Sequence, residues 1–138
     1  MTLATNKKFI TSSSKFINWE MVERLKQLDL KHHNDTLTEI LVLLNKNGPN
    51  RVRKIQTSCE QKKYHETEFE VHALKSSLSY VGAHRIIGIC SYIEQQIRQC
   101  NYTKIEKYCY SLAPELSKVL DALNAYCETT KSTTNESN

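Results

Sequence analysis

Hydrophobic residues recur every three or four positions along most of the chain, which is the spacing of an amphipathic helix. In the first segment with this pattern the repeating residues are Trp19, Val22, Leu25 and Leu28. They predict a short helix over 19–28, with Asn18 as its N-cap. A second helix is predicted to begin near Thr36-Leu-Thr-Glu39, which matches a capping box, and to reach a break at Gly48-Pro49. The periodicity continues beyond this break to about Lys63, so the sequence allows one interrupted helix or two.

Three further helices are predicted in the second half of the chain. The segment TEFEVHALKSSLSYVG carries one apolar stripe and closes at Gly82, a typical helix stop. The next helix is expected over about 84–99, and Pro114 inside the last one predicts a bend or a helix boundary. The apolar positions of the three helices are Val71, Leu74, Leu78 and Val81, then Ile86, Cys90, Ile93 and Ile97, then Ile105, Cys109, Leu112, Leu116, Val119, Leu123 and Tyr126.

These elements predict an all-α protein, an antiparallel four-helix bundle of up-down-up-down topology with a short extra N-terminal helix. Short links between the later helices favour antiparallel neighbours. The domain is expected to span residues 17–127. Residues 1–16 and 128–138 are polar and rich in Ser and Thr, so we expect a flexible N-terminal segment and a disordered C-terminal tail.

Composition narrows the class of protein. A length of 138 residues fits one domain, and only three Gly and two Pro favour helices. A net charge of +4 is too small and too spread out for a nucleic-acid binder. The five cysteines contain no C-x-x-C pair, which argues against a disulfide framework and a zinc site. Without a signal-peptide core or a membrane-spanning run, we expect a cytoplasmic protein, with the nucleus as a further location.

The third predicted helix carries an outward histidine. At about 100° per residue, His72 lies roughly 140° from the centre of the apolar stripe, with Lys75, Ser76, Ser79 and Glu68 around it. An exposed imidazole is mostly uncharged and nucleophilic at neutral pH. Lys75, one turn along, supplies a positive charge where phosphoryl oxygens would lie. The sequence shows no metal-binding group nearby, which favours storage of a phosphoryl group over its hydrolysis.

The string His72-Ala-Leu-Lys-Ser-Ser-Leu-Ser-Tyr-Val-Gly82-Ala resembles the phosphoacceptor motif H-x-L-K-G-S-S of histidine-containing phosphotransfer (HPt) proteins. The similarity extends over residues 17–127 and is closest to fungal and plant single-domain phosphorelay intermediates. It implies that His72 is phosphorylated, that Lys75 stabilises the phosphoryl group, and that Gly82 ends the acceptor helix. It also implies polar support of the imidazole from the preceding helix, for which Lys46 and Asn47 are candidates.

The resemblance further implies a phosphocarrier without kinase activity of its own. Its partners would be the receiver domains of hybrid sensor kinases and response regulators, which would bring the Mg²⁺, so no cofactor or metal is expected on this chain. We expect a monomer. The candidate docking residues are Ser76, Ser79, Gly82, Met21, Leu25 and Glu68.

The chain departs from the family pattern at Ser76, where HPt proteins usually have the Gly that keeps space open for the receiver. We expect slower or narrower partner exchange. One alternative is an adaptor that binds receiver domains without transfer. Another is a basic helical nucleic-acid module based on Arg51, Arg53 and Lys54, but that cluster lacks interleaved aromatic residues.

Overall fold

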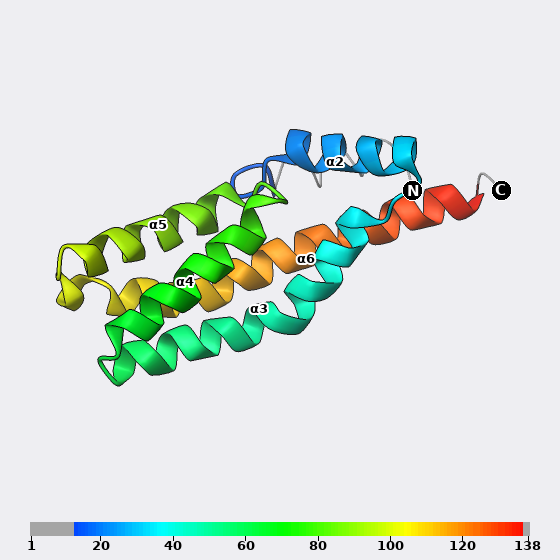
Figure 1. The fold of residues 1–138 in the computed structure, drawn as a ribbon. Coiled ribbons are helices and arrows are strands. Elements are labelled where there is room, and N and C mark those ends of the chain that lie inside the picture. Colours follow the sequence, from blue (N-terminus) through cyan, green and yellow to red (C-terminus); the bar gives the residue numbers. More distant parts are fainter. Residues whose placement is uncertain (1–12, 137–138) are drawn as a thin grey trace.

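The computed structural model describes residues 13–136, with side chains as far as Thr129, and within this range it is helical without a strand. Figure 1 shows the helices in chain order. They are α2 (Trp19–His32), α3 (Thr36–Glu60), α4 (Tyr64–Ser79), α5 (His84–Arg98), the short 3-10 helix η1 (Tyr102–Lys104) and α6 (Glu106–Glu136).

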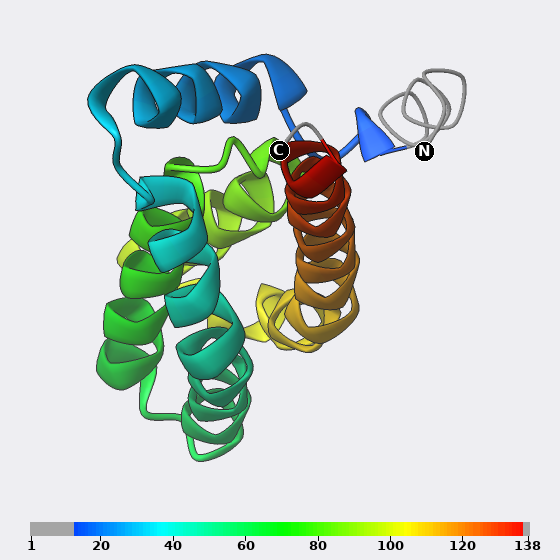
Figure 2. The ribbon, with the colours of Figure 1, turned by 90° about the vertical axis from the view of Figure 1, so that its right-hand side faces the viewer.

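Helices α3 to α6 form an antiparallel bundle, and short links join consecutive helices. Within the bundle, α4 packs mainly against α3 and α5, while α6 packs against α3 and α5. Figure 2 shows α2 lying across one end of the bundle instead of along it. The predicted all-α bundle with an extra N-terminal helix is therefore confirmed.

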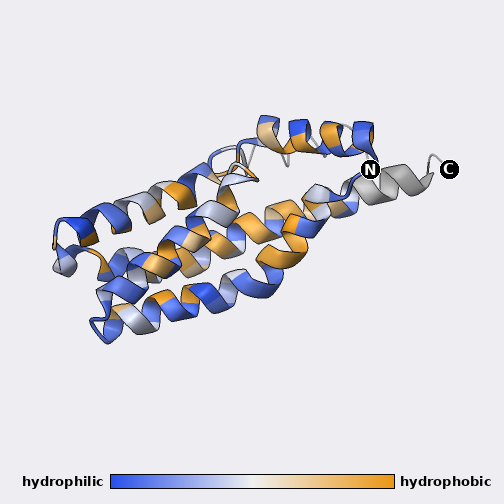
Figure 3. Cartoon of the chain, in the orientation of Figure 1, coloured by the Kyte–Doolittle hydropathy of each residue, from blue (hydrophilic) through white to orange (hydrophobic). Residues whose placement is uncertain are grey.

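The core is built from the apolar stripes that the sequence predicts for α4, α5 and α6. All the stripe positions of these helices are buried, including Val71, Leu74 and Leu78 on α4. Figure 3 shows hydrophobic and hydrophilic residues alternating around the helices, as expected for helices that bury one face. Cys90 and Cys109 are buried among these residues, whereas Cys127 is half-buried.

Helix α2 packs on the bundle through its first turns. Asn18 is its N-cap and accepts a hydrogen bond from the backbone N–H of Met21, as predicted. Trp19 and Val22 are buried, but Leu28 is 54% exposed and the helix continues to His32, beyond the expected end. The hydrophobic repeat of this segment therefore overstates how much of the helix is covered.

The start of α3 is capped from outside the helix. The expected capping box of Thr36 and Glu39 is wrong, because the N-cap is Asp35 and its side chain makes no capping hydrogen bond. The buried carboxylate of Asp29, on α2, instead accepts a hydrogen bond of 2.9 Å from the backbone N–H of Leu37. Burial raises the pKa of Asp29, but hydrogen bonds from Leu37 and Thr36 outweigh it and leave that pKa below the ordinary value of 3.8.

Neither proline ends its helix. Helix α3 is one element that contains Pro49, and Figure 1 shows it changing direction partway along its length. Gly48 is buried there, and a Cβ on it would lie 3.2 Å from Leu116 Cδ2, so the glycine lets α6 approach closely. Helix α6 continues through Pro114. Of the two options left open for residues 36–63, the structure shows one helix.

The two ends of the domain extend further than the sequence indicates. Ser13 is buried and accepts a hydrogen bond of 2.7 Å from Trp19 Nε1, while Phe16 packs against the core. The backbone of α6 is helical to Glu136, past the expected end at residue 127. Residues 1–12 and 137–138, which belong to the segments expected to be flexible, lie outside the described residues.

None of the helices in the described part of the chain is both long enough and apolar enough to cross a bilayer.

Candidate functional site

His72 projects from the outer face of α4. The buried side of this helix is made by Val71, Leu74 and Leu78. At about 100° per residue, His72 lies on the opposite side of the helix from the centre of this apolar stripe, so it points away from the core. The side chain of His72 is 65% exposed. A partner protein can thus reach its ring without any rearrangement of the bundle.

The imidazole is held by a buried carboxylate of the neighbouring helix. Nδ1 of His72 lies 3.2 Å from Oε2 of Glu94 on α5, and the Glu94 side chain is only 3% exposed. A carboxylate accepts hydrogen bonds, so this contact places the ring hydrogen on Nδ1. Nε2 then carries the free lone pair on the exposed edge of the ring.

Two cations compensate the charge of Glu94. Lys75 Nζ lies 3.2 Å from Oε1, and Arg98 Nη2 donates to Oε2 at the same distance. Oε1 is buried and accepts no hydrogen bond from any described residue, so its contact with Lys75 is an ion pair without hydrogen-bond geometry. Arg98 also lies 3.5 Å from Glu68 of α4. Burial of a carboxylate is costly unless it is paired, and this set of neighbours supplies the pairing.

The residues predicted around His72 occupy its two sides. Lys75 and Glu68 lie toward α5, with side chains 34% and 32% exposed, and both belong to the charged cluster. Ser76 and Ser79 are exposed on the outer face, and the Ser79 hydroxyl donates to the carbonyl of Ser76. Small side chains therefore lie beyond His72 in the direction of the helix end.

Gly82, a predicted docking residue, is buried in the turn after α4. Its φ of 64° is left-handed, and its carbonyl accepts a hydrogen bond of 2.8 Å from the N–H of Asn18. Met21 is 39% exposed beside this turn, and Leu25 is half-buried against the core. Gly82 thus fastens α2 to the acceptor helix and offers no free surface to a partner.

The polar side chain that contacts the imidazole comes from α5, and not from the preceding helix α3 as expected. Lys46 and Asn47 are exposed residues of α3. Lys46 lines a hollow together with Lys26 of α2. Asn47 lines a second hollow together with Leu74 and Ser77, which lie on the core side and the α3 side of α4. The prediction for Lys46 and Asn47 is wrong because His72 points toward α5, the helix that follows α4 in the chain.

Glu94 and Arg98 are the two site residues that the sequence analysis missed. Glu94 follows Ile93 directly and precedes Ile97 by one turn, so it lies on the edge of an apolar stripe. Charged residues are rarely buried unless they are paired. A carboxylate at the edge of an apolar stripe therefore indicates, from sequence alone, a buried group that needs a cation beside it. Arg98, one turn later on the same helix, is such a cation.

The described residues contain no group of three or more His, Cys, Asp or Glu side chains arranged to hold a metal ion. Burial raises the pKa of the Cys90 thiol to about 12, which disfavours the reactive thiolate form of this residue. The chemistry of the site therefore centres on one nucleophilic ring nitrogen, a carboxylate behind it, and two cations.

Comparison with known proteins assigns a family to this arrangement. The family model of the Hpt domain matches residues 39–126, which include His72, Lys75, Glu94 and Arg98. No curated protein and no solved structure matches the chain. Hpt domains are phosphocarriers, they take part in histidine phosphotransfer in phosphorelays, and they interact with receiver domains. The chain belongs to the Hpt domain family.

Proposed function

We propose that this protein is the intermediate of a multistep phosphorelay, and that it carries the phosphoryl group on Nε2 of His72. The observation that supports this most directly is the combination of a 65% exposed imidazole with a buried carboxylate on its Nδ1. The phosphoryl donor would be the aspartyl phosphate of one receiver domain, and the acceptor would be the aspartate of another.

The transfer step needs a nucleophile with a free lone pair. Nε2 attacks phosphorus as the bond between phosphorus and the aspartate oxygen breaks, and the electron pair of that bond stays on the aspartate. No proton has to leave, because the ring hydrogen remains on Nδ1. The ring becomes positive during attack, and the carboxylate of Glu94 stabilises that charge much as a buried aspartate stabilises an imidazolium in a hydrolase.

Lys75 and Arg98 are proposed to receive the phosphoryl oxygens. Both cations lie next to the His72–Glu94 pair, and Arg98 is 63% exposed. Arginine can bind phosphate oxygens through two parallel N–H donors, whereas lysine acts as a point charge. Once the phosphoryl group is present, these side chains can turn from Glu94 toward it without unfolding any helix.

Mg²⁺ and the remaining catalytic groups are proposed to come with the receiver domain. A receiver that holds an aspartyl phosphate must itself neutralise that group, and carboxylates with Mg²⁺ are the usual means. The phosphohistidine would then persist after the receiver dissociates, which is what a carrier requires.

An adaptor that binds receivers without transfer is the second candidate. The specific observation in its favour is Ser76, whose exposed hydroxymethyl group lies one turn after His72 where an incoming receiver must pass. The two candidates differ in one result, because the adaptor stays unphosphorylated when a phosphorylated receiver is added.

The test is to locate the phosphoryl group chemically. After incubation with a phosphorylated receiver, the carrier should contain phosphate that is lost in acid, kept in base and mapped by mass spectrometry to residue 72. His65→Gln is the matched control, since His65 is also exposed on α4. Phosphate on another residue would exclude His72 as the acceptor, and no phosphate on the wild type would exclude the carrier function.

A further inference from the structure

The two sides of the acceptor helix differ in chemistry. On the α5 side of His72 lies the charged cluster of Glu68, Lys75, Glu94 and Arg98. On the α3 side, the exposed residues of α4 include two large aromatic side chains, Phe69 at 68% exposed and Tyr80 at 64%. The ion pairs of the site are therefore segregated from its exposed apolar surface.

Phe69 and Tyr80 flank the phosphoacceptor along the helix. At 1.5 Å rise per residue, Phe69 lies about 4.5 Å before His72 and Tyr80 about 12 Å beyond it. At about 100° per residue, both lie within roughly 80° of His72, on the same side of it as Ser76. We call Phe69, His72, Ser76 and Tyr80 the acceptor strip.

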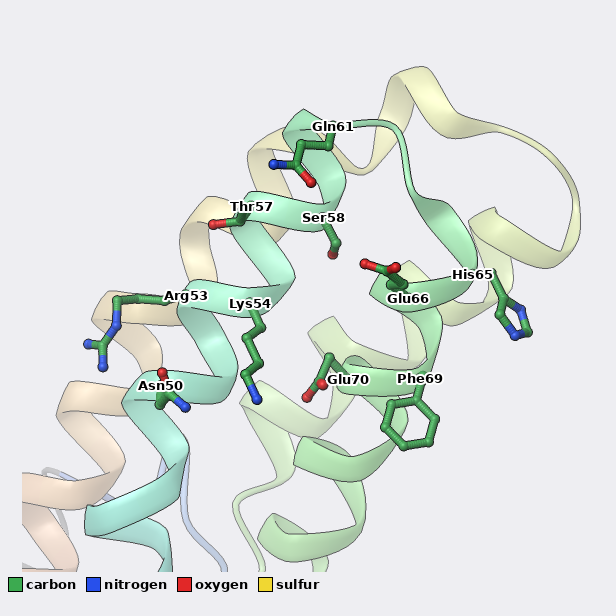
Figure 4. A pocket seen from close by; sticks show the side chains of 10 residues that line it. All are labelled: Asn50, Arg53, Lys54, Thr57, Ser58, Gln61, His65, Glu66, Phe69 and Glu70. Carbon is green, nitrogen blue, oxygen red and sulfur yellow. The ribbon is translucent and has the colours of Figure 1, made fainter.

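Two hollows between α3 and α4 border the acceptor strip. The first, of about 640 Å³, has Phe69 at its edge and Lys54 and Glu70 among its lining residues. Figure 4 shows Phe69 and His65 on the outer side of α4, while Lys54 and Glu70 extend between the two helices. The second, of about 180 Å³, is lined by Tyr80 and by Leu43 of α3. A single exposed aromatic residue needs no explanation, but two beside adjacent hollows form a surface fit for a protein partner.

The occupant of this surface follows from its continuity with His72. A specific protein interface covers at least about 600 Å² on each partner, which is a disc of roughly 14 Å radius. A receiver domain that brings its aspartate to Nε2 must therefore cover Phe69, and a footprint of ordinary size reaches Tyr80. The larger hollow is lined by Lys54 together with Glu66 and Glu70, so it presents charges of both signs to the partner.

We propose that Phe69 and Tyr80 are the apolar anchors of the receiver-docking surface, so that receivers bind across the α3 side of α4 while the α5 side handles the phosphoryl group. This rests on the proposed function for the identity of the partner. The receiver would place apolar side chains of its own, next to its phosphorylation site, on Phe69 and in the hollow beside Tyr80.

The test measures the affinity for the receiver domain separately from the rate of phosphoryl transfer. The protein variants Phe69→Ala and Tyr80→Ala are titrated with an unphosphorylated receiver domain, and single-turnover transfer from the phosphorylated receiver is measured at saturation. Each variant should weaken binding about tenfold, as expected for an aromatic anchor, with an unchanged rate at saturation. Phe69→Glu, which adds a charge at the same exposed position, should weaken it further. Tyr110→Ala is the control, since Tyr110 is an exposed aromatic residue on α6, which does not pack closely against α4.

Binding equal to that of the wild type in both alanine variants would overturn the docking proposal and leave the carrier function intact. The opposite pattern, weakened receiver binding in these variants together with no phosphate on His72, would keep the docking surface and exclude the carrier function.

Discussion

Nδ1 of His72 and Oε2 of Glu94 are 3.2 Å apart, yet the two side chains are 65% and 3% exposed. The pair therefore connects an imidazole ring that a partner protein can reach with a carboxylate that is shielded from solvent. Such an arrangement fixes the tautomer and orientation of the ring while leaving Nε2 free, which is the requirement for an imidazole that exchanges a phosphoryl group.

Replacing Glu94 should slow transfer without unfolding the domain. Glu94→Gln keeps a hydrogen-bond acceptor near Nδ1 but removes the charge that stabilises a positive ring. A hydrogen bond to a charged group contributes about 1.5–3 kcal/mol, so the single-turnover rate should fall about 10- to 100-fold. Rapid-quench kinetics measures the rate, and ¹⁵N NMR of the His72 ring reports the tautomer. Gln95→Ala, at the exposed neighbouring position, should transfer normally; equal rates for Glu94→Gln and wild type would remove the role assigned to the carboxylate.

Ser76→Gly should make the acceptor more accessible. The serine side chain is exposed one turn after His72, so its removal opens space on the path of the receiver, and kcat/KM for transfer should rise several-fold. Glycine inside a helix costs about 0.5 kcal/mol relative to serine, so the free energy of unfolding should drop slightly. Ser76→Tyr should act in the opposite direction and raise KM. If transfer were insensitive to both changes, position 76 would have no part in partner access.

Asp29 should make the corner between α2 and α3 sensitive to acid. Its pKa is lowered in the folded protein, so its contribution to stability is present above the ordinary value of 3.8 and disappears as the pH falls through the lower folded pKa. Asp29→Asn should lower the free energy of unfolding by about 1–2 kcal/mol at pH 7. Urea unfolding at several pH values checks this, because the difference from wild type should shrink toward pH 3. A difference that stays constant with pH would mean that the charge of Asp29 is not involved.

Two glycine-to-alanine substitutions should have opposite signs. At Gly82 the φ is 64°, and a Cβ would lie 3.0 Å from Asn18 Cβ and 3.1 Å from Met21 Sδ. Gly82→Ala should therefore destabilise the protein by about 1–2 kcal/mol and loosen α2. Gly88 lies inside α5 with nothing within 4 Å of such a Cβ, so Gly88→Ala should stabilise by about 0.5–1 kcal/mol. Thermal unfolding monitored by circular dichroism compares the two, and destabilisation of equal size at both sites would contradict this account.

The helices and their buried faces were predictable because burial in a bundle follows helical periodicity. Val71, Leu74 and Leu78 were assigned to the core from spacing alone, and that assignment placed His72 on the outer face. Periodicity does not say which neighbouring helix a polar side chain meets. For that reason periodicity does not indicate Glu94. The expectation for Lys46 and Asn47 came from the family resemblance, which implies support from the preceding helix, whereas the structure supplies it from α5.

Contacts between elements account for the other differences. The cap of α3 comes from Asp29, which lies eight residues before Leu37 in the chain, so no local capping motif could indicate it. Leu28 fits the repeat of its helix but is exposed, because α2 crosses the end of the bundle and, near its C-terminal end, buries Asp29 instead of Leu28. Both features depend on how α2 packs against the rest of the protein. The hydrophobic pattern of α2 does not specify that position.

The central claim is that His72 is the residue that carries the phosphoryl group. The most direct measurement is single-turnover transfer from a phosphorylated receiver domain to the wild type, to His72→Gln and to His65→Gln under identical conditions. The account predicts rapid transfer to the wild type and to His65→Gln, with no detectable transfer to His72→Gln. Transfer to His72→Gln at the wild-type rate would contradict it.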